Sequence, residues 1–198
     1  MPTTEERLKV YGLKEAEVDL KDLTVRAGQT VVIGKRGTVG QFKALSTKSF
    51  VTLKEWIGVS DKHVKENPHL AARPSAKAEV PHRLIPMMAA SARPGGLGAA
   101  AKFTPVVMKD MKVLAHRFVF GDSTIIHTAA ELLQQAYGKI DLGAILFLTI
   151  EVQSGGVLEI DPDVHILWAH KLKIHDGGKI KVHLGNTFKL DVNVLEKV

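Results

Sequence analysis

Two stretches of the sequence repeat each other: Ile150-Glu151-Val152-Gln153-Ser154-Gly155-Gly156-Val157-Leu158-Glu159-Ile160 and Leu172-Lys173-Ile174-His175-Asp176-Gly177-Gly178-Lys179-Ile180-Lys181-Val182. The copies are 22 residues apart, and both their apolar positions and their glycine pairs coincide. Apolar and polar residues alternate within each copy, which is typical of a strand with one buried face. An alternating repeat of this length predicts the coils of a stacked β-solenoid, with a glycine turn between short strands.

Charged residues provide a second test of this spacing. With coils in register, Glu151 lies beside Lys173 and Glu159 lies beside Lys181. Such neighbouring pairs contribute only a few tenths of a kcal/mol each, but they oppose a slip in register. We therefore expect an all-β chain that forms a parallel β-helix with coils of roughly 22 residues. Two similar hairpins in an antiparallel β-sandwich are the alternative.

Composition describes an ordinary globular chain of 198 residues and a net charge of +6. The sequence contains no cysteine, which excludes disulfides and cysteine-based metal sites or catalysis. It has no secretory leader and no apolar run of membrane-spanning length, so we expect a cytoplasmic protein without a membrane span. The positive charge permits contact with nucleic acid or another polyanion but does not require it.

The N-terminal part divides into a polar segment, 1–16, for which we expect a short helix, and a β region, 17–59. In the β region, Leu23–Val25 and Val31–Ile33 flank a turn at Gly28, and Phe50–Leu53 is expected to be a further strand. The spacing of 22 fits this region poorly. We therefore expect the first coils to be irregular or to form a separate cap.

Residues 60–104 differ in composition from the rest of the chain. They hold five of the eight prolines and seven Lys or Arg against three acids. This composition predicts a basic arm or insertion with too little apolar surface for a core of its own. One apolar group within it is a candidate for docking on a partner, with basic residues around it: Arg83, Leu84, Ile85, Met87, Met88 and Arg93.

The third region, 105–198, is expected to form the solenoid core. Its first coil contains a strand ending near Phe120 and a glycine corner at Gly121. A short helix is expected at about 128–138, with a capping box from Thr128 to Glu131 and a stop at Gly138. Continuing the spacing past the repeat pairs Ile166 with Phe188 and Trp168 with Leu190.

Three sets of side chains in the repeat region are weighed as sites. Lys171, Lys173, Lys179 and Lys181 form a basic row, but no aromatic residue interleaves with them for base stacking. Asp161 and Asp163 are a candidate pair of catalytic carboxylates for glycoside cleavage. The simpler interpretation of the lysine row is a solvated face, and that of the two aspartates is a common corner sequence between strands. His165, His170 and His175 diverge on strands, so we predict no metal site and no cofactor.

The aliphatic stack, the glycine corners and the charged pairs over roughly 113–195 resemble the parallel β-helix class. One branch, the secreted polysaccharide lyases and hydrolases, implies a carbohydrate-binding or carbohydrate-cleaving protein. Another, the bactofilin-like proteins, implies a short cytoplasmic β-helix that polymerises end to end. Open sheet ends pair unless they are covered. We therefore expect a structural or interaction module rather than an enzyme, which self-assembles or docks into a larger complex through its arm and open ends. The carbohydrate protein is the alternative.

Overall fold

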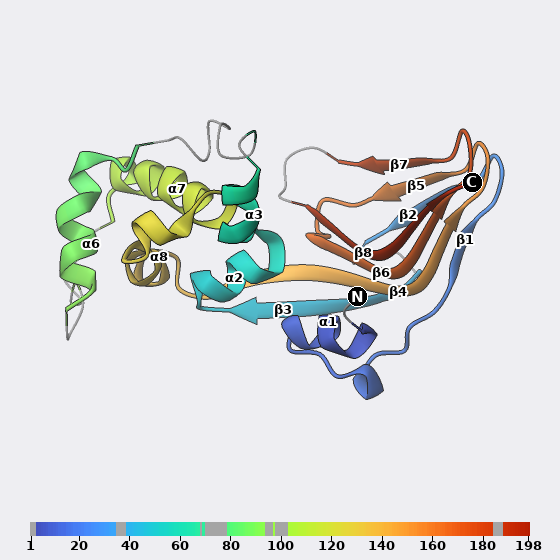
Figure 1. Cartoon of the computed structure of the whole chain (residues 1–198), viewed down its shortest axis with the longest axis horizontal. Helices are drawn as coiled ribbons and strands as arrows, with labels where there is room; N and C mark the ends of the chain where they lie inside the picture. Colours follow the sequence, from blue (N-terminus) through green and yellow to red (C-terminus); the bar gives the residue numbers. More distant parts are fainter. Residues whose placement is uncertain are drawn as a thin grey trace. The chain divides into compact units, whose positions relative to one another are not determined.

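The structure is a computed structural model that describes residues 3–34, 39–67, 69, 79–93, 97, 103–183 and 188–198. Their contacts divide the chain into two units (Figure 1). The sheet unit comprises Met1–Leu45 and Asp141–Val198, and the helical unit comprises Ser46–Ile140. The helical unit is thus an insertion in the sequence of the sheet unit.

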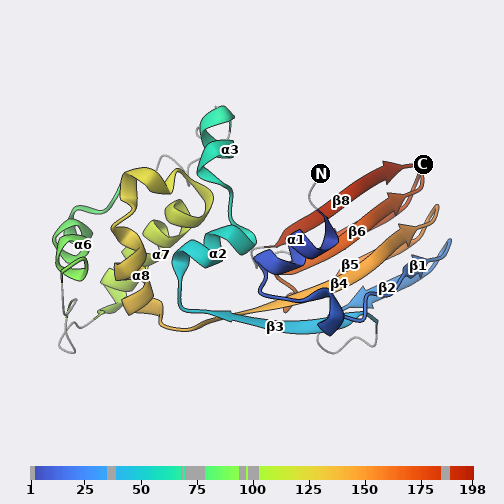
Figure 2. The same cartoon turned by 60° about the horizontal axis from the view of Figure 1, so that its bottom comes forward.

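The described part of the sheet unit contains one α-helix, one 3₁₀ turn and eight strands. They are α1 Thr4–Val10, η1 Glu15–Glu17, β1 Leu23–Val25, β2 Thr30–Ile33, β3 Gln41–Thr47, β4 Ile140–Val152, β5 Val157–Ile160, β6 Ile166–Ile174, β7 Lys179–Val182 and β8 Lys189–Lys197. One sheet has the order β1-β4-β6-β8, with β3 also paired to β4 (Figure 2), and the other has the order β2-β5-β7 (Figure 1).

The predicted register between the two copies of the repeat is confirmed. Ile150 pairs with Leu172, and Glu159 pairs with Lys181. The pairings of β1, β4, β6 and β8, and those of β2, β5 and β7, are all parallel, which excludes the antiparallel β-sandwich. The alternation of apolar residues set this register, because a slip by one residue would turn every side chain to the other face.

The N-terminal strands and the C-terminal strand depart from the spacing of 22 residues. Leu23 pairs directly with Ile150 and Val31 with Leu158, so the first two strands are neighbours of the repeat although the insertion separates them in sequence. At the other end Ile166 pairs with Lys189 rather than with Phe188, and Trp168 with Asp191 rather than with Leu190. One additional residue between β7 and β8 accounts for this second shift.

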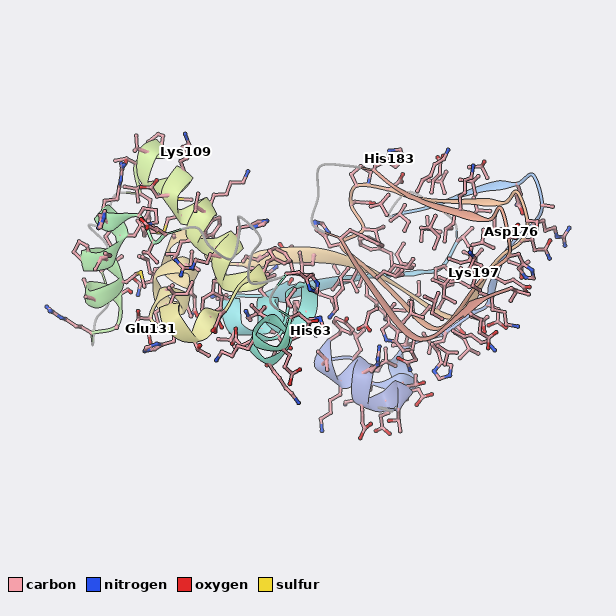
Figure 3. The ribbon with its side chains drawn as sticks, turned by 45° about the horizontal axis from the view of Figure 1, so that its top comes forward. His63, Lys109, Glu131, Asp176, His183 and Lys197 are labelled. Atoms are coloured by element: carbon pink, nitrogen blue, oxygen red, sulfur yellow. The ribbon has the colours of Figure 1, made fainter. Side chains whose placement is uncertain are left out.

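Equivalent glycine turns lie next to one another in successive layers. Gly28, Gly155 and Gly177 have φ of 70°, 72° and 78°, values that favour glycine over residues with a Cβ. Each turn is closed by a backbone hydrogen bond of 2.8–3.0 Å from the residue after the glycine. The Asp176 turn and Lys197, labelled in Figure 3, lie at the same end of the unit, where Asp176 N donates to Val198 O.

The core of the sheet unit lies between the two sheets. Its buried cluster takes Ile145 and Phe147 from one part of β4 and Ile150 and Val152 from the next part. These positions do not follow a single alternation, so the inward face changes phase once, between Phe147 and Ile150. Leu148, at this phase change, is 41% exposed.

The prediction of an all-β chain, and with it the parallel β-helix or β-solenoid interpretation, is wrong. The chain is mixed α/β, with six α-helices among the described residues. Two segments expected as strands are helices: Phe50–Ile57 is α2 and Pro105–Phe120 is α7. In α7 the buried Met111, Leu114 and Phe118 follow a helical spacing, and Thr104 caps the first turn ahead of Pro105.

The helical unit also contains α3 Asp61–Glu66, η2 His82–Leu84, α6 Ile85–Ser91, η3 Ser123–Ile126 and α8 Ala129–Tyr137. Helix α8 confirms the helix expected at about 128–138, and Gly138 follows it with a positive φ of 64°. The capping box expected there is absent, because Thr128 makes no side-chain cap bond. Such a box is formed instead by Thr3 and Glu6 at the start of α1.

In the part of the chain that the structure describes, no helix combines the length and the apolar character needed to cross a membrane.

Candidate interaction surface

The two ends of the stacked strands differ in how well they cover the core. At the β1 and β2 end, Val25 and Ile33 are fully buried. Val39 and Phe42, which follow β2 in the sequence, pack partly buried against the same cluster. The inward apolar residues of β1 and β2 are therefore already shielded from solvent within the chain.

The β7 and β8 end leaves apolar residues exposed. Leu190 pairs with the fully buried Leu167, but it is itself 42% exposed. Leu195 pairs with the fully buried Leu172 and is 68% exposed. Val182, next to the buried Ile160, is 39% exposed. Side chains that would be core residues in an inner layer thus reach solvent, because no described strand pairs with the outer edge of β7 or β8.

Charged side chains lie on both strands of this open end. On β7, Lys179 and Lys181 are exposed, and Lys181 donates to Glu159 at 3.2 Å as the spacing predicted. On β8, Glu196 pairs with Lys171 of the neighbouring strand at 2.6 Å. The two charged residues of β7 are therefore both lysines, of which Lys181 is paired with Glu159, whereas β8 carries both signs of charge.

Helix α1 holds the face of β8 that points away from the core. Asp191 accepts hydrogen bonds from the Arg7 guanidinium and from the Tyr11 hydroxyl. Burial, reinforced by the hydrogen bond to Asp191, raises the pKa of Tyr11 well above its ordinary value. The phenol therefore stays a donor across the physiological range. These contacts hold β8 on the face that points away from the core. They leave its outer edge open (Figure 2).

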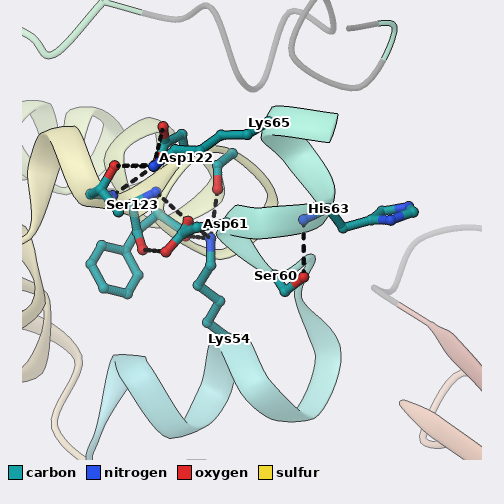
Figure 4. A network of polar contacts seen from close by, with 10 residues as sticks. Lys54, Ser60, Asp61, His63, Lys65, Asp122 and Ser123 are labelled. Carbon is teal, nitrogen blue, oxygen red and sulfur yellow. Dashed lines mark hydrogen bonds and ion pairs between the residues drawn. The ribbon is translucent and has the colours of Figure 1, made fainter. Parts of the chain in front are cut away.

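A polar cluster in the helical unit is the other dense set of charged contacts in the described residues (Figure 4). The buried Lys54 ammonium donates to Phe118 O at 2.9 Å and Gly121 O at 2.5 Å, and it pairs with Asp61 at 3.0 Å. Asp61 also accepts from the backbone N–H and the hydroxyl of Ser123. Burial by itself would raise the pKa of Asp61, but the hydrogen bonds from Ser123 and Lys54 outweigh it and lower the pKa.

This cluster has a structural explanation. Lys54 satisfies carbonyls at the C-terminal end of α7 that have no partner within the helix, and Asp61 compensates the charge that this requires. All of its main members are bonded to one another or to backbone. It therefore joins α2, α3 and the end of α7.

The apolar group predicted to dock on a partner is divided by the fold. Leu84 and Met88 are buried in the helical unit, whereas Ile85 is exposed and Met87 is partly exposed. Arg83 pairs with Asp110 at 2.6 Å, and Arg93 is exposed. Of the predicted arm, residues 68, 70–78, 94–96 and 98–102 lie outside the described residues. Within its described part, Val64, Leu84 and Met88 are buried, and η2 contacts α7 while α6 contacts α8.

The four lysines of the predicted basic row lie on two different sheets. Lys171 and Lys173 belong to β6, and Lys179 and Lys181 belong to β7. Lys171 and Lys181 are paired with Glu196 and Glu159, so part of the row is neutralised within the chain.

Asp161 and Asp163 lie between β5 and β6, where their backbones close the turn. Asp161 N donates to Ile33 O, and its carbonyl accepts from Val164 N. The Asp163 carbonyl lies 3.1 Å from His165 Nδ1 and so close to Gly143 that a Cβ there would meet it at 2.2 Å. Both aspartates thus have a place in the turn that does not depend on catalysis.

The three histidines bond to separate partners. His165 Nδ1 accepts from Gly143 N, His170 Nδ1 lies 3.1 Å from Thr4 Oγ1, and His175 pairs with Glu151 at 2.7 Å. Among the described residues, no three His, Asp or Glu side chains are grouped as metal ligands.

Sequence reasoning anticipated an open sheet end, but it did not identify Leu190 and Leu195 as its exposed residues. It also missed the anchor that Arg7 and Tyr11 form on Asp191. The Thr3–Glu6 spacing signals the start of that helix, but no local signal indicates where the helix docks.

Comparison with protein-family models, with curated proteins and with solved structures found no match to this chain.

Proposed function

We propose that this protein is a structural interaction module that self-associates through the open β7 and β8 end of its sheet unit. The observation that carries the proposal is the exposure of Leu190 and Leu195 in rows whose inner members, Leu167 and Leu172, are fully buried. Removing apolar surface from water is favourable by about 25 cal/mol per Å². A second chain placed on this end would extend both the hydrogen-bond ladder and the core.

The unpaired edge supports the same proposal. A strand at the edge of a sheet presents free N–H and C=O groups, which serve as a template for another strand. Since α1 covers the outer face of β8 through Asp191, the approach that remains is along the edge. We expect assembly in the cytoplasm, the compartment that the sequence favours.

Leu195→Asp tests the proposal, because it places a charge where a second chain would bury an apolar side chain. We expect the wild type to have at least twice the mass of one chain, 21.6 kDa, by light scattering. The variant should have the mass of a single chain. Leu195 is exposed in the isolated chain, so circular dichroism should be unchanged.

Val106→Asp is the matched control, since Val106 is an exposed apolar residue on α7 of the helical unit. It should retain the mass of the wild type. A monomeric wild type, or a Leu195→Asp variant that keeps its full assembly mass, would overturn the proposal.

A further inference from the structure

The sequence and hydrogen bonding of β8 indicate how a second copy would pair with it, an inference that rests on the proposed function. This strand reads Lys189-Leu190-Asp191-Val192-Asn193-Val194-Leu195-Glu196-Lys197. The order of residues is mirrored about the centre of the strand. A lysine precedes a leucine near one end, Lys189-Leu190, and a leucine precedes a glutamate near the other, Leu195-Glu196. Such an order is self-complementary when two copies run antiparallel.

The backbone N–H groups of β8 alternate in direction along the strand, and this alternation shifts once along its length. Lys189 N donates to His165 O at 2.8 Å, and Val198 N donates to Ile174 O at 3.0 Å, so both residues direct their N–H toward β6. In a regular strand only every second residue faces the same neighbour. Residues 189 and 198 are an odd number of positions apart, so the alternation must shift by one between them.

The side chains of β8 change phase in the same way. Leu190 lies in the row of the core residue Leu167, and Leu195 lies in the row of the core residue Leu172. Five positions apart, the two leucines would face opposite sides of a regular strand. The register skips the pair His170 and Asn193, which places the phase change there. Consequently Leu190 and Leu195 both point inward, and both direct their N–H and C=O away from β6.

We propose that β8 pairs antiparallel with β8 of a second copy about a two-fold axis between Val192 and Asn193. Leu190 of one chain then lies opposite Leu195 of the other, and the symmetry repeats this contact. In this register the outward-facing backbone groups of Leu190 and Leu195 meet, as a hydrogen-bonded antiparallel pair requires. Lys189 lies opposite Glu196 of the second copy, so directly opposed charges have opposite sign.

Neighbouring arrangements fit less well. An axis centred on Asn193 would oppose Lys189 to Lys197 and Leu190 to Glu196, which sets like charges together and a leucine against a carboxylate. Pairing of the open end with the β1 and β2 end of another chain would bring the exposed Leu195 against strands whose apolar side chains, such as Val25 and Ile33, are already fully buried. A two-fold contact also closes on itself and produces a dimer rather than a fibre.

The absence of cysteine from the sequence makes the register testable by disulfide formation. Leu190→Cys and Leu195→Cys are made separately, with tags of different size, and are oxidised alone and as a mixture. Cα atoms of directly opposite residues are about 5.5 Å apart in a hydrogen-bonded pair, within the range that a disulfide spans. We expect the mixture to form a covalent heterodimer and each variant alone to remain uncrosslinked.

Asn193→Cys provides a second variant that does not alter either leucine. Because the two copies of residue 193 lie beside the axis, this variant should cross-link with itself. Circular dichroism confirms that each variant is folded before it is oxidised.

The outcomes separate the pairing from the proposed function. Heterodimer from the mixture together with self-linkage at residue 193 supports the two-fold register. A dimeric mass by light scattering without these cross-links, or with self-linkage of Leu195→Cys instead, overturns the register and leaves self-association in place. A monomeric wild type overturns both.

Discussion

The end of α7 depends on one side chain from another helix. Lys54 is buried, and its ammonium donates to two backbone carbonyls and to Asp61. A buried ammonium is costly unless it is paired and hydrogen-bonded. Removing the carboxylate should therefore affect stability more than removing an exposed charge.

We expect Asp61→Asn to lower the free energy of unfolding at neutral pH by about 1–3 kcal/mol, as for a charged hydrogen-bond partner lost from a buried group. The folded state lowers the pKa of Asp61, so its contribution is present above the unfolded value and is lost as pH falls through the folded one. Urea unfolding at a series of pH values should show the wild type and the variant converging in acid.

Glu66→Gln is the control for this substitution, because the Lys62–Glu66 pair is exposed and its atoms are 3.8 Å apart. It should change stability by less than about 0.5 kcal/mol. An equal loss for both variants would contradict the role assigned to Asp61.

At the scale of elements, the glycine turns join the two sheets and repeat in successive layers. Gly177 has a φ of 78°, and its Cβ would come no closer than 3.6 Å to its nearest neighbour, Gly155 N. Space is therefore available for a methyl group, and only the backbone conformation opposes it. This separates conformational strain from steric clash at one position.

Gly177→Ala is accordingly expected to destabilise the chain by about 1–2 kcal/mol, the cost of a left-handed conformation in a residue with a Cβ. Chemical denaturation measures this loss. Asp176→Ala, at the exposed neighbouring position, should change stability by less than about 0.5 kcal/mol. A loss at position 176 as large as that at position 177 would argue against backbone strain as the cause.

The burial of neighbouring apolar residues on β5 and β7 leads to a second prediction. Leu158 on β5 is fully buried, whereas Ile180, its neighbour on β7, is only partly buried. Leu158→Ala should cost about 2–5 kcal/mol, as for other core aliphatic truncations, and Ile180→Ala should cost clearly less in the isolated chain. Denaturation of dilute protein tests this order, and equal costs would mean that the β7 end is not open.

At the scale of the whole molecule, the sheet unit draws its core from residues on both sides of the insertion. All members of its buried cluster lie within Met1–Leu45 or Asp141–Val198. The insertion Ser46–Ile140 buries its own residues, such as Leu84, Met111 and Leu132. Each unit therefore contains buried apolar residues of its own.

Replacing Ser46–Ile140 by a short Gly/Ser linker should leave a folded sheet unit, because the cost of closing a loop changes only slowly with its length. Circular dichroism and cooperative unfolding test the fold. Light scattering then shows which of two surfaces mediates association: the docking group around Ile85 that the sequence predicts, or the open end of the sheet unit. An excised protein that keeps its assembly would support the sheet end, and a folded monomer would favour the helical unit.

The sequence by itself determined the local features of the sheet unit. Alternation and the glycine pairs established the register of Ile150 with Leu172, the turns at Gly155 and Gly177 and the contact of Glu159 with Lys181. Helix α8 was also predictable, from its apolar face and the glycine that ends it. These features depend on residues close in sequence or on a repeated pattern, which a single chain displays directly.

Only the tertiary structure decided which helices and edges surround that pattern. The segment ending at Phe120 contains alternating and helical apolar spacings together, and packing of Met111, Leu114 and Phe118 selects the helix. Likewise, burial of Leu84 and exposure of Leu195 depend on elements far away in the chain. Local sequence specifies which side chains are apolar, but whether water is excluded from them depends on long-range contacts, and these decided both the mixed α/β fold and the open end.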